Sequence, residues 1–220
     1  NLDSAYFCQV KDKTGKIIYR LPNHHFDIKA TSPGRGTIVL LGGVIDYGEI
    51  NRNLFWIRPN YVDTVYSTSD WTDVRPYYII QRNNRAADYA WSVRMKVGDI
   101  TREDAEREQL CNVYALKSGL LFNYLFNPKQ QGAGFCPANG KSKTISRLFK
   151  NDIDSYCPSI DLWQAIAYKT LYQKEDYLYL LIDAFKFFEE GAKPPFPDLK
   201  EDSNPVLVKL KLKNGKRRYV

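Results

Sequence analysis

The stretch TREDAEREQLCNVYALKSGLLFNYLF, residues 101–126, decides the fold class. Thr101 precedes Asp104 by three residues, which is the spacing of a capping box at a helix N-terminus. Apolar residues then recur at intervals of three and four, as on one face of an α-helix. They are Leu110, Val113, Tyr114, Leu121, Tyr124 and Leu125. The stretch therefore predicts an amphipathic helix whose apolar face needs a core.

Two further helices are predicted after it. The first begins after Ser159 and turns four apolar side chains inward. These are Leu162, Trp163, Ile166 and Leu171. The second runs over about residues 175–190, is apolar on nearly all sides, and stops at Gly191. A helix with so little polar surface is expected to be buried or to dock on a partner.

The first hundred residues favour strands and turns. Tyr6–Val10 and Lys16–Leu21 predict a hairpin in which Gly15 takes the positive-φ turn position. Short apolar runs over 36–48, 53–59, 62–67 and 76–82 continue as a meander or small barrel.

Period two also returns near the C-terminus, where one strand face is apolar and the other is basic. The alternating residues are Val206, Val208, Leu210 and Leu212 on one side, and Lys209, Lys211 and Lys213 on the other. Asn214-Gly215 then predicts a hairpin turn.

Together these patterns predict an α+β protein with an N-terminal antiparallel β meander or small barrel, central and C-terminal helices, and a C-terminal β-hairpin. The β-rich region covers 1–98, the helical region 99–192, and the loop and hairpin 193–220. No linker forces a division, so one continuous domain is expected.

The composition is that of a soluble globular protein, with 44% hydrophobic and 26% charged residues in a chain of 220. No apolar run approaches the roughly 20 residues that span a bilayer. The formal charge of +7 favours polyanionic partners, either nucleic acid or an acidic protein surface. The chain carries no signal-peptide pattern, which leaves the compartment open.

The cysteines and histidines indicate no metal site. Cys8, Cys111, Cys136 and Cys157 form no C-x-x-C pair, and either two disulfides or four reduced thiols fit their spacing, with thiols favoured. His24, His25 and Asp27 are interpreted as a solvated turn, because adjacent side chains on an extended segment point to opposite faces.

The stretch GAGFCPANGKSKT, residues 132–144, nearly spells a phosphate-binding loop. Phe135 stands where the pattern requires glycine, and Pro137 lacks one of the N–H donors of the cradle. The stretch is interpreted as a structural loop between helices.

Three short motifs offer an enzymatic alternative: Arg20, the run Ser67-Thr68-Ser69, and the pair Glu106 and Glu108. In combination they resemble the arginine–serine–glutamate class of mono-ADP-ribosyltransferases. The resemblance implies NAD as cofactor, with the arginine on its phosphates and a glutamate stabilising positive charge on the ribose. The helix predicted over residues 101–126 would have the two glutamates in its first turn. In the family, the corresponding glutamates lie on a strand or its loop.

The preferred interpretation is a non-catalytic binding or assembly module with a basic, Tyr/Arg-rich surface and no cofactor. Basic residues interleaved with aromatic ones can neutralise phosphates and stack on bases. The predicted contact residues are Arg82, Arg85, Trp91, Arg94, Lys96, Lys141, Lys143, Lys216, Arg217 and Arg218. A structural subunit that meets only other proteins remains a further alternative, because Tyr, Trp and Arg also anchor protein interfaces.

Overall fold

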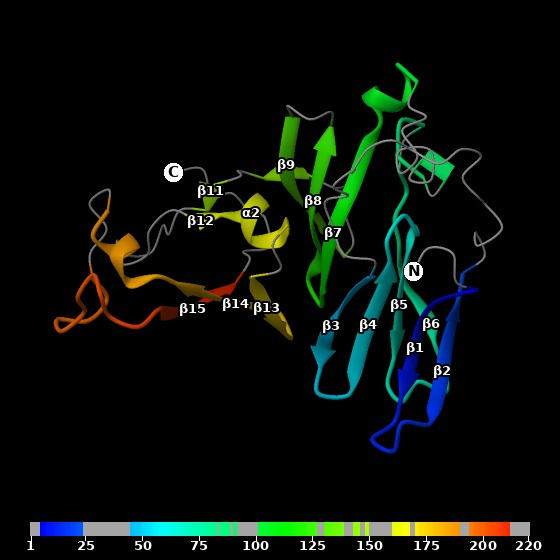
Figure 1. The fold of residues 1–220 in the computed structure, drawn as a ribbon, viewed down its shortest axis with the longest axis horizontal. Coiled ribbons are helices and arrows are strands. Elements are labelled where there is room, and N and C mark those ends of the chain that lie inside the picture. Colours follow the sequence, from blue (N-terminus) through cyan, green and yellow to red (C-terminus); the bar gives the residue numbers. More distant parts are fainter. Residues whose placement is uncertain are drawn as a thin grey trace.

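The computed structural model describes residues 5–23, 45–82, 84–88, 90–91, 101–126, 130–138, 143–145, 148–149, 160–167, 170–189 and 194–211. In these ranges the protein is mostly β, with small antiparallel sheets and one short α-helix (Figure 1). No helix within them is long and apolar enough to cross a bilayer.

The N-terminal region contains a hairpin and a four-stranded meander. The hairpin pairs β1 (Tyr6–Lys11) with β2 (Ile17–Pro22), and Gly15 turns it with φ of +86°. The meander runs in sequence order through β3 (Ile45–Asn51), β4 (Leu54–Pro59), β5 (Thr64–Thr68) and β6 (Arg75–Ile79). The predicted N-terminal hairpin and antiparallel meander are confirmed, whereas residues 36–44 of the first predicted run lie outside the described residues.

A second four-stranded sheet forms the middle layer. After the short 3-10 helix η1 (Asp104–Glu106), its strands are β7 (Glu108–Leu116), β8 (Gly119–Phe126), β9 (Gln130–Pro137) and β10 (Lys143–Ile145), in the order β10-β9-β8-β7. Gly119, with φ of +153°, follows the two-residue turn between β7 and β8. A Cβ at this position would lie 2.2 Å from the Cys136 carbonyl oxygen, so glycine is required there.

Both faces of the middle sheet are covered. Val113, Ala115 and Leu120 pack in a core with Trp56 and Val65 of the meander. The neighbouring residues Tyr114, Leu116 and Leu121 point the other way, into a larger core. Successive residues of β7 and β8 are therefore apolar because each face meets a different layer.

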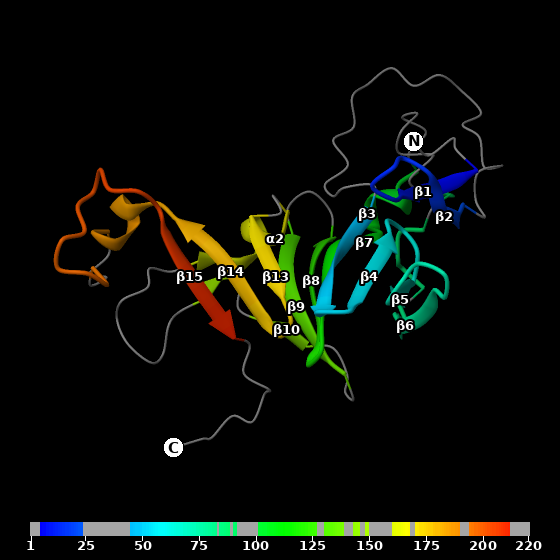
Figure 2. The same cartoon turned by 90° about the horizontal axis from the view of Figure 1, so that it is seen from below.

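The larger core is closed by the C-terminal elements. A minimal sheet of β11 (Leu148–Phe149) and β12 (Ile160–Asp161) leads into α2 (Leu162–Ala167). The last sheet pairs β13 (Leu171–Lys174), β14 (Tyr177–Ile182) and β15 (Val206–Lys211), with the 3-10 helix η2 (Ala184–Phe187) after β14. Figure 2 shows this sheet continuing from the middle layer, away from the meander.

The expected α+β class with central and C-terminal helices is wrong. At 101–126 the capping contacts do form, because Thr101 Oγ1 donates to Asp104 Oδ2 at 3.0 Å and Asp104 N donates to Thr101 Oγ1 at 3.1 Å. These bonds lead only into the single turn of η1, whose N-cap residue Glu103 makes no side-chain capping bond, and within this described stretch no α-helix follows. A β-bulge between Leu110 and Val113 then shifts the strand register. Because of the bulge, these two residues face the same core although they are three positions apart, which is the spacing expected of a helix.

The expected helix over 175–190 is also wrong, since residues 177–182 form strand β14. Its sequence YLYLLI alternates in burial, with Leu178, Leu180 and Ile182 inside. The helix after Ser159 is reduced to α2, where Leu162, Trp163 and Ile166 are buried as expected. The predicted strand near the C-terminus is present as β15, whereas Asn214-Gly215 lie outside the described residues.

Candidate functional site

The sheet of β13, β14 and β15 has one buried and one exposed face. Leu171, Leu178 and Leu210 turn inward. We call the opposite side the tyrosine–lysine face; it comprises Tyr172, Lys174, Tyr177, Tyr179, Leu181, Leu207, Lys209 and Lys211. The alternation of strands β13 to β15 thus gathers three tyrosines and three lysines on one side of a small sheet.

The strand register places lysines beside tyrosine rings on this face. Tyr177 pairs with Lys211, and Tyr179 pairs with Lys209. The Lys209 ammonium lies 3.8 Å from the centroid of the Tyr177 ring and 5.9 Å from that of Tyr179, and the Lys211 ammonium lies 5.6 Å from the Tyr177 centroid. Such cation–π contacts hold the ammonium groups over the sheet instead of letting them extend into solvent.

Tyr172 extends the line of rings toward the rest of the molecule. Its side chain is 62% exposed, and its ring centroid lies 6.2 Å from that of Tyr179. The tyrosine–lysine face therefore offers flat aromatic surface and positive charge within a few ångströms of each other, which is what stacking on a base and neutralising a phosphate require.

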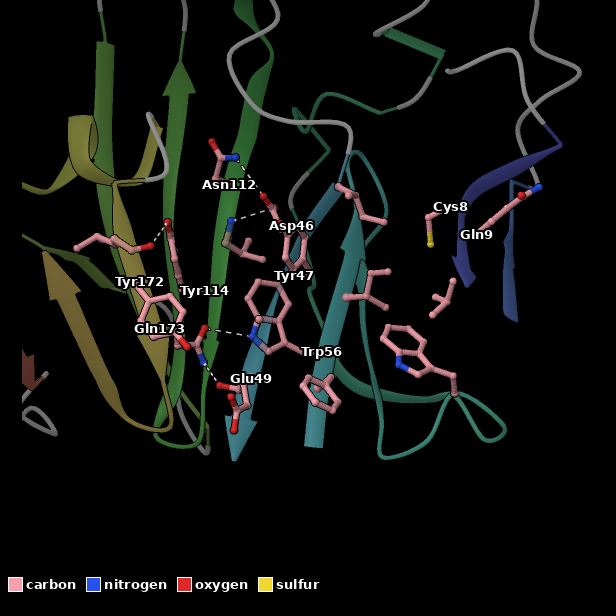
Figure 3. Close-up of a pocket in the computed structure, with 18 residues that line it drawn as sticks. Cys8, Gln9, Asp46, Tyr47, Glu49, Trp56, Asn112, Tyr114, Tyr172 and Gln173 are labelled. Carbon is pink, nitrogen blue, oxygen red and sulfur yellow. Dashed lines mark hydrogen bonds between the residues drawn. The ribbon is translucent and has the colours of Figure 1, made fainter. Parts of the chain in front are cut away.

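A second candidate is a cavity of about 540 Å³ between β1, β3, β4, β7 and β13 (Figure 3). Tyr172 lines it too, so the cavity adjoins the tyrosine–lysine face. Its wall is fixed by Gln173, whose amide donates to the Glu49 carbonyl oxygen at 3.1 Å and to the Ala115 carbonyl oxygen at 2.5 Å. The same side chain accepts a hydrogen bond of 3.1 Å from the Trp56 indole N–H.

A buried ion pair between Asp46 and Arg58 adjoins the cavity, and Asp46 is part of its wall. Asp46 Oδ2 accepts hydrogen bonds from Arg58 Nη1 at 3.0 Å and from the Val113 backbone N–H at 3.1 Å, while Oδ1 accepts one from the Asn112 amide at 3.1 Å. Arg58 has no exposed surface. Burial lowers the pKa of its guanidinium, and the charge of Asp46 opposes that shift. The bonds of Asp46 to Asn112 and Val113 join the meander to the middle sheet.

Three of the contact residues predicted from sequence are described in detail, and they do not form one patch. Trp91 is buried beside Tyr61, and its indole N–H donates to the Asp104 carbonyl oxygen at 2.9 Å, so its ring is not available at the surface. Arg82 forms an ion pair with Asp63 and donates to the Ala87 carbonyl oxygen at 2.6 Å. Arg85 is exposed.

The remaining predicted contacts cannot be placed on a surface. Lys143 begins β10, but only its backbone is described. Six others lie outside the described residues. They are Arg94, Lys96, Lys141, Lys216, Arg217 and Arg218. His24, His25 and Asp27 also lie outside them.

The stretch that nearly spells a phosphate-binding loop has a structural explanation in its described part. Gly132 and Gly134 belong to β9, not to a loop between helices. Cβ atoms there would lie 2.5 Å from the Tyr124 hydroxyl and 2.3 Å from the Phe122 ring, so the glycines make room for cross-strand aromatic rings.

The residues of the ADP-ribosyltransferase-like set lie on separate elements. Arg20 is on β2 with its guanidinium 5.2 Å from the Tyr6 ring centroid, and the Thr68 hydroxyl caps the backbone N–H of Trp71 at 2.8 Å. Glu106 ends η1 and Glu108 begins β7. None of these residues is among those lining the cavity.

Sequence reasoning missed Tyr172, Lys174, Tyr177 and Tyr179. The available signal was the alternation of tyrosine and leucine over 177–180, which matches the alternation of aliphatic residues and lysine over 208–211. In the described parts of the chain no group of three His, Cys, Asp or Glu residues could hold a metal ion. Comparisons with protein-family models, with curated proteins and with solved structures gave no match.

Proposed function

We propose that the protein is a binding module that holds single-stranded nucleic acid on its tyrosine–lysine face. The observation that supports this most directly is the pairing of Tyr177 and Tyr179 with Lys211 and Lys209 across β14 and β15. Proteins that bind single strands use aromatic rings on a sheet for the bases and nearby cations for the backbone.

The charges of the chain favour this partner. Lys174, Lys209 and Lys211 stand on one face, in a protein of net charge +7. An anionic backbone that approaches the face gains from both the local lysines and the overall positive field. Leu181 and Leu207, 64% and 63% exposed, add apolar surface at the far end of the same sheet, where a base can rest.

The test is fluorescence anisotropy with a labelled single-stranded oligonucleotide of roughly 12 nucleotides, titrated at several salt concentrations upward from about 50 mM. We expect log affinity to fall linearly with log salt. Lys209→Gln with Lys211→Gln should reduce the slope by about 1.4, because each phosphate contact on a single strand contributes about 0.7. Tyr172→Leu should weaken binding roughly 5-fold or more if a base stacks on this ring.

Matched controls separate this surface from general charge. Lys13→Gln with Lys16→Gln removes the same charge from the exposed turn of the β1–β2 hairpin. If that pair weakens binding as much as the change at Lys209 and Lys211, the net charge alone attracts the strand and the proposed face is wrong. Binding of an acidic polypeptide that equals binding of the oligonucleotide, with no effect of Tyr172→Leu, would assign the face to an acidic protein.

A further inference from the structure

The cavity beside Tyr172 has the dimensions of a small-molecule site. Its volume of about 540 Å³ falls within the range of roughly 300 to 1,000 Å³ typical of ligand pockets. Its walls come from five strands that belong to four different sheets, and the hydrogen bonds of Gln173 fix three of these sheets to one another (Figure 3). A site built in this way is preorganised, because no wall has to form when a ligand enters.

Aromatic rings dominate the accessible part of the wall. Tyr47 is 74% exposed, Phe55 is 36% exposed, and Tyr172 and Trp71 complete the set. Trp71 has a backbone φ of +66°, which is unfavourable for a bulky residue, and the Thr68 hydroxyl holds it there. The faces of such rings carry partial negative charge and attract cations.

The charged residues of the wall also favour a positively charged ligand. The 18 described residues that line the cavity include no lysine, arginine or histidine, although the chain as a whole carries a charge of +7. They include two carboxylates, of which Asp46 is engaged by Arg58, Asn112 and Val113. Glu49 is half-buried, and no ion pair to it is found among the described residues.

From this combination of rings and a carboxylate that has no ion pair among the described residues, we infer that the cavity binds a small organic cation of the quaternary ammonium class. A phosphate or carboxylate ligand would be repelled by Glu49. A neutral apolar ligand would remove water from that carboxylate without replacing its interactions, which is costly. An ammonium group with apolar substituents instead gains from Glu49 and from the ring faces together.

The experiment compares choline with its uncharged isostere 3,3-dimethyl-1-butanol, followed by the tryptophan fluorescence of the whole chain, since Trp56 and Trp71 line the cavity. We expect saturable binding of choline and an affinity for the isostere at least about 3-fold lower. Equal affinities, or no saturable response to choline, would overturn the inference.

Variants locate the site. Glu49→Gln is expected to weaken choline about 3- to 10-fold and leave the isostere unchanged. Glu201→Gln, which removes an exposed carboxylate remote from the cavity wall, should change neither. If the Glu49→Gln protein folds and still prefers choline to the same extent, the inference is contradicted. If that variant does not fold, Trp71→Leu takes its place and must reduce the preference for choline.

This inference does not depend on the proposed nucleic-acid site. Glu49→Gln should leave the oligonucleotide affinity and its salt slope unchanged, and Lys209→Gln with Lys211→Gln should leave the preference for choline over its isostere unchanged. Either site can therefore fail in its own assay without affecting the result of the other.

Discussion

The buried pair of Asp46 and Arg58 gives the sharpest stability prediction, through the substitution Asp46→Ala. The carboxylate accepts three hydrogen bonds of 3.0 to 3.1 Å from β4 and β7, and the partner guanidinium has no exposed surface. Removing the carboxylate leaves a buried charge with its counter-ion gone, which costs about 3 to 5 kcal/mol. The Val113 N–H and the Asn112 amide lose their acceptor at the same time.

Each buried donor left unsatisfied costs about 1 to 3 kcal/mol, but the contributions share one site and do not add in full. We therefore expect Asp46→Ala to lower the free energy of unfolding by about 4 kcal/mol, a large part of the 5 to 15 kcal/mol typical of a folded domain. Replacing both residues, as in Asp46→Leu with Arg58→Met, removes the unpaired charge as well and should recover most of the loss.

Urea unfolding followed by fluorescence measures these differences through the midpoint and slope of the transition. The control is Asp73→Ala, which removes a carboxylate from an exposed pair with Arg75, whose side chains are 54% and 77% exposed. That loss should stay below about 1 kcal/mol. If Asp46→Ala costs no more than Asp73→Ala, or if the double variant is as unstable as the single one, the assignment of a structural role to the buried pair is refuted.

Two other outcomes test the packing and the protonation of the core. Gly134→Ala places a Cβ 2.3 Å from the Phe122 ring and should destabilise the fold by about 1 to 3 kcal/mol. Adding Phe122→Leu should restore part of this loss. If thermal unfolding shows no effect of Gly134→Ala, the packing of the Phe122 ring over Gly134 is contradicted. Burial raises the pKa of the Cys111 thiol from 9.0 to about 12, so the folded protein keeps a proton that the unfolded chain releases. Stability should therefore fall as the pH rises from 9 toward 12, and Cys111→Ala should fall less steeply just above pH 9; identical slopes would speak against it.

The sequence allowed correct predictions where only one side of a strand is buried. In β2 and β15 burial alternates from residue to residue, and the polar side chains Arg20, Lys209 and Lys211 fall on the exposed side, so period two is visible. In β7 and β8 it is not, because Val113 and Tyr114 face different cores and both must be apolar. With a bulge added, the resulting pattern matched a helix better than a strand.

The same limit applies to the candidate site. The basic side of β15 is visible in the spacing of Lys209 and Lys211, but nothing in the sequence identifies β14 as its neighbouring strand. Pairing between distant segments brings Tyr177 and Tyr179 beside these lysines. Trp91 was expected at the surface for its type and its basic neighbours, whereas its indole fills a small core with Tyr61 and Ala87.

Gln173 has a consequence for how the molecule comes apart. One amide on β13 contacts β3, β4 and β7, so the last sheet cannot separate from both the meander and the middle sheet without breaking all three bonds. Melting should accordingly be a single concerted event across the described sheets. A leucine at this position would uncouple the C-terminal segment, which would then detach at a lower temperature than the remainder.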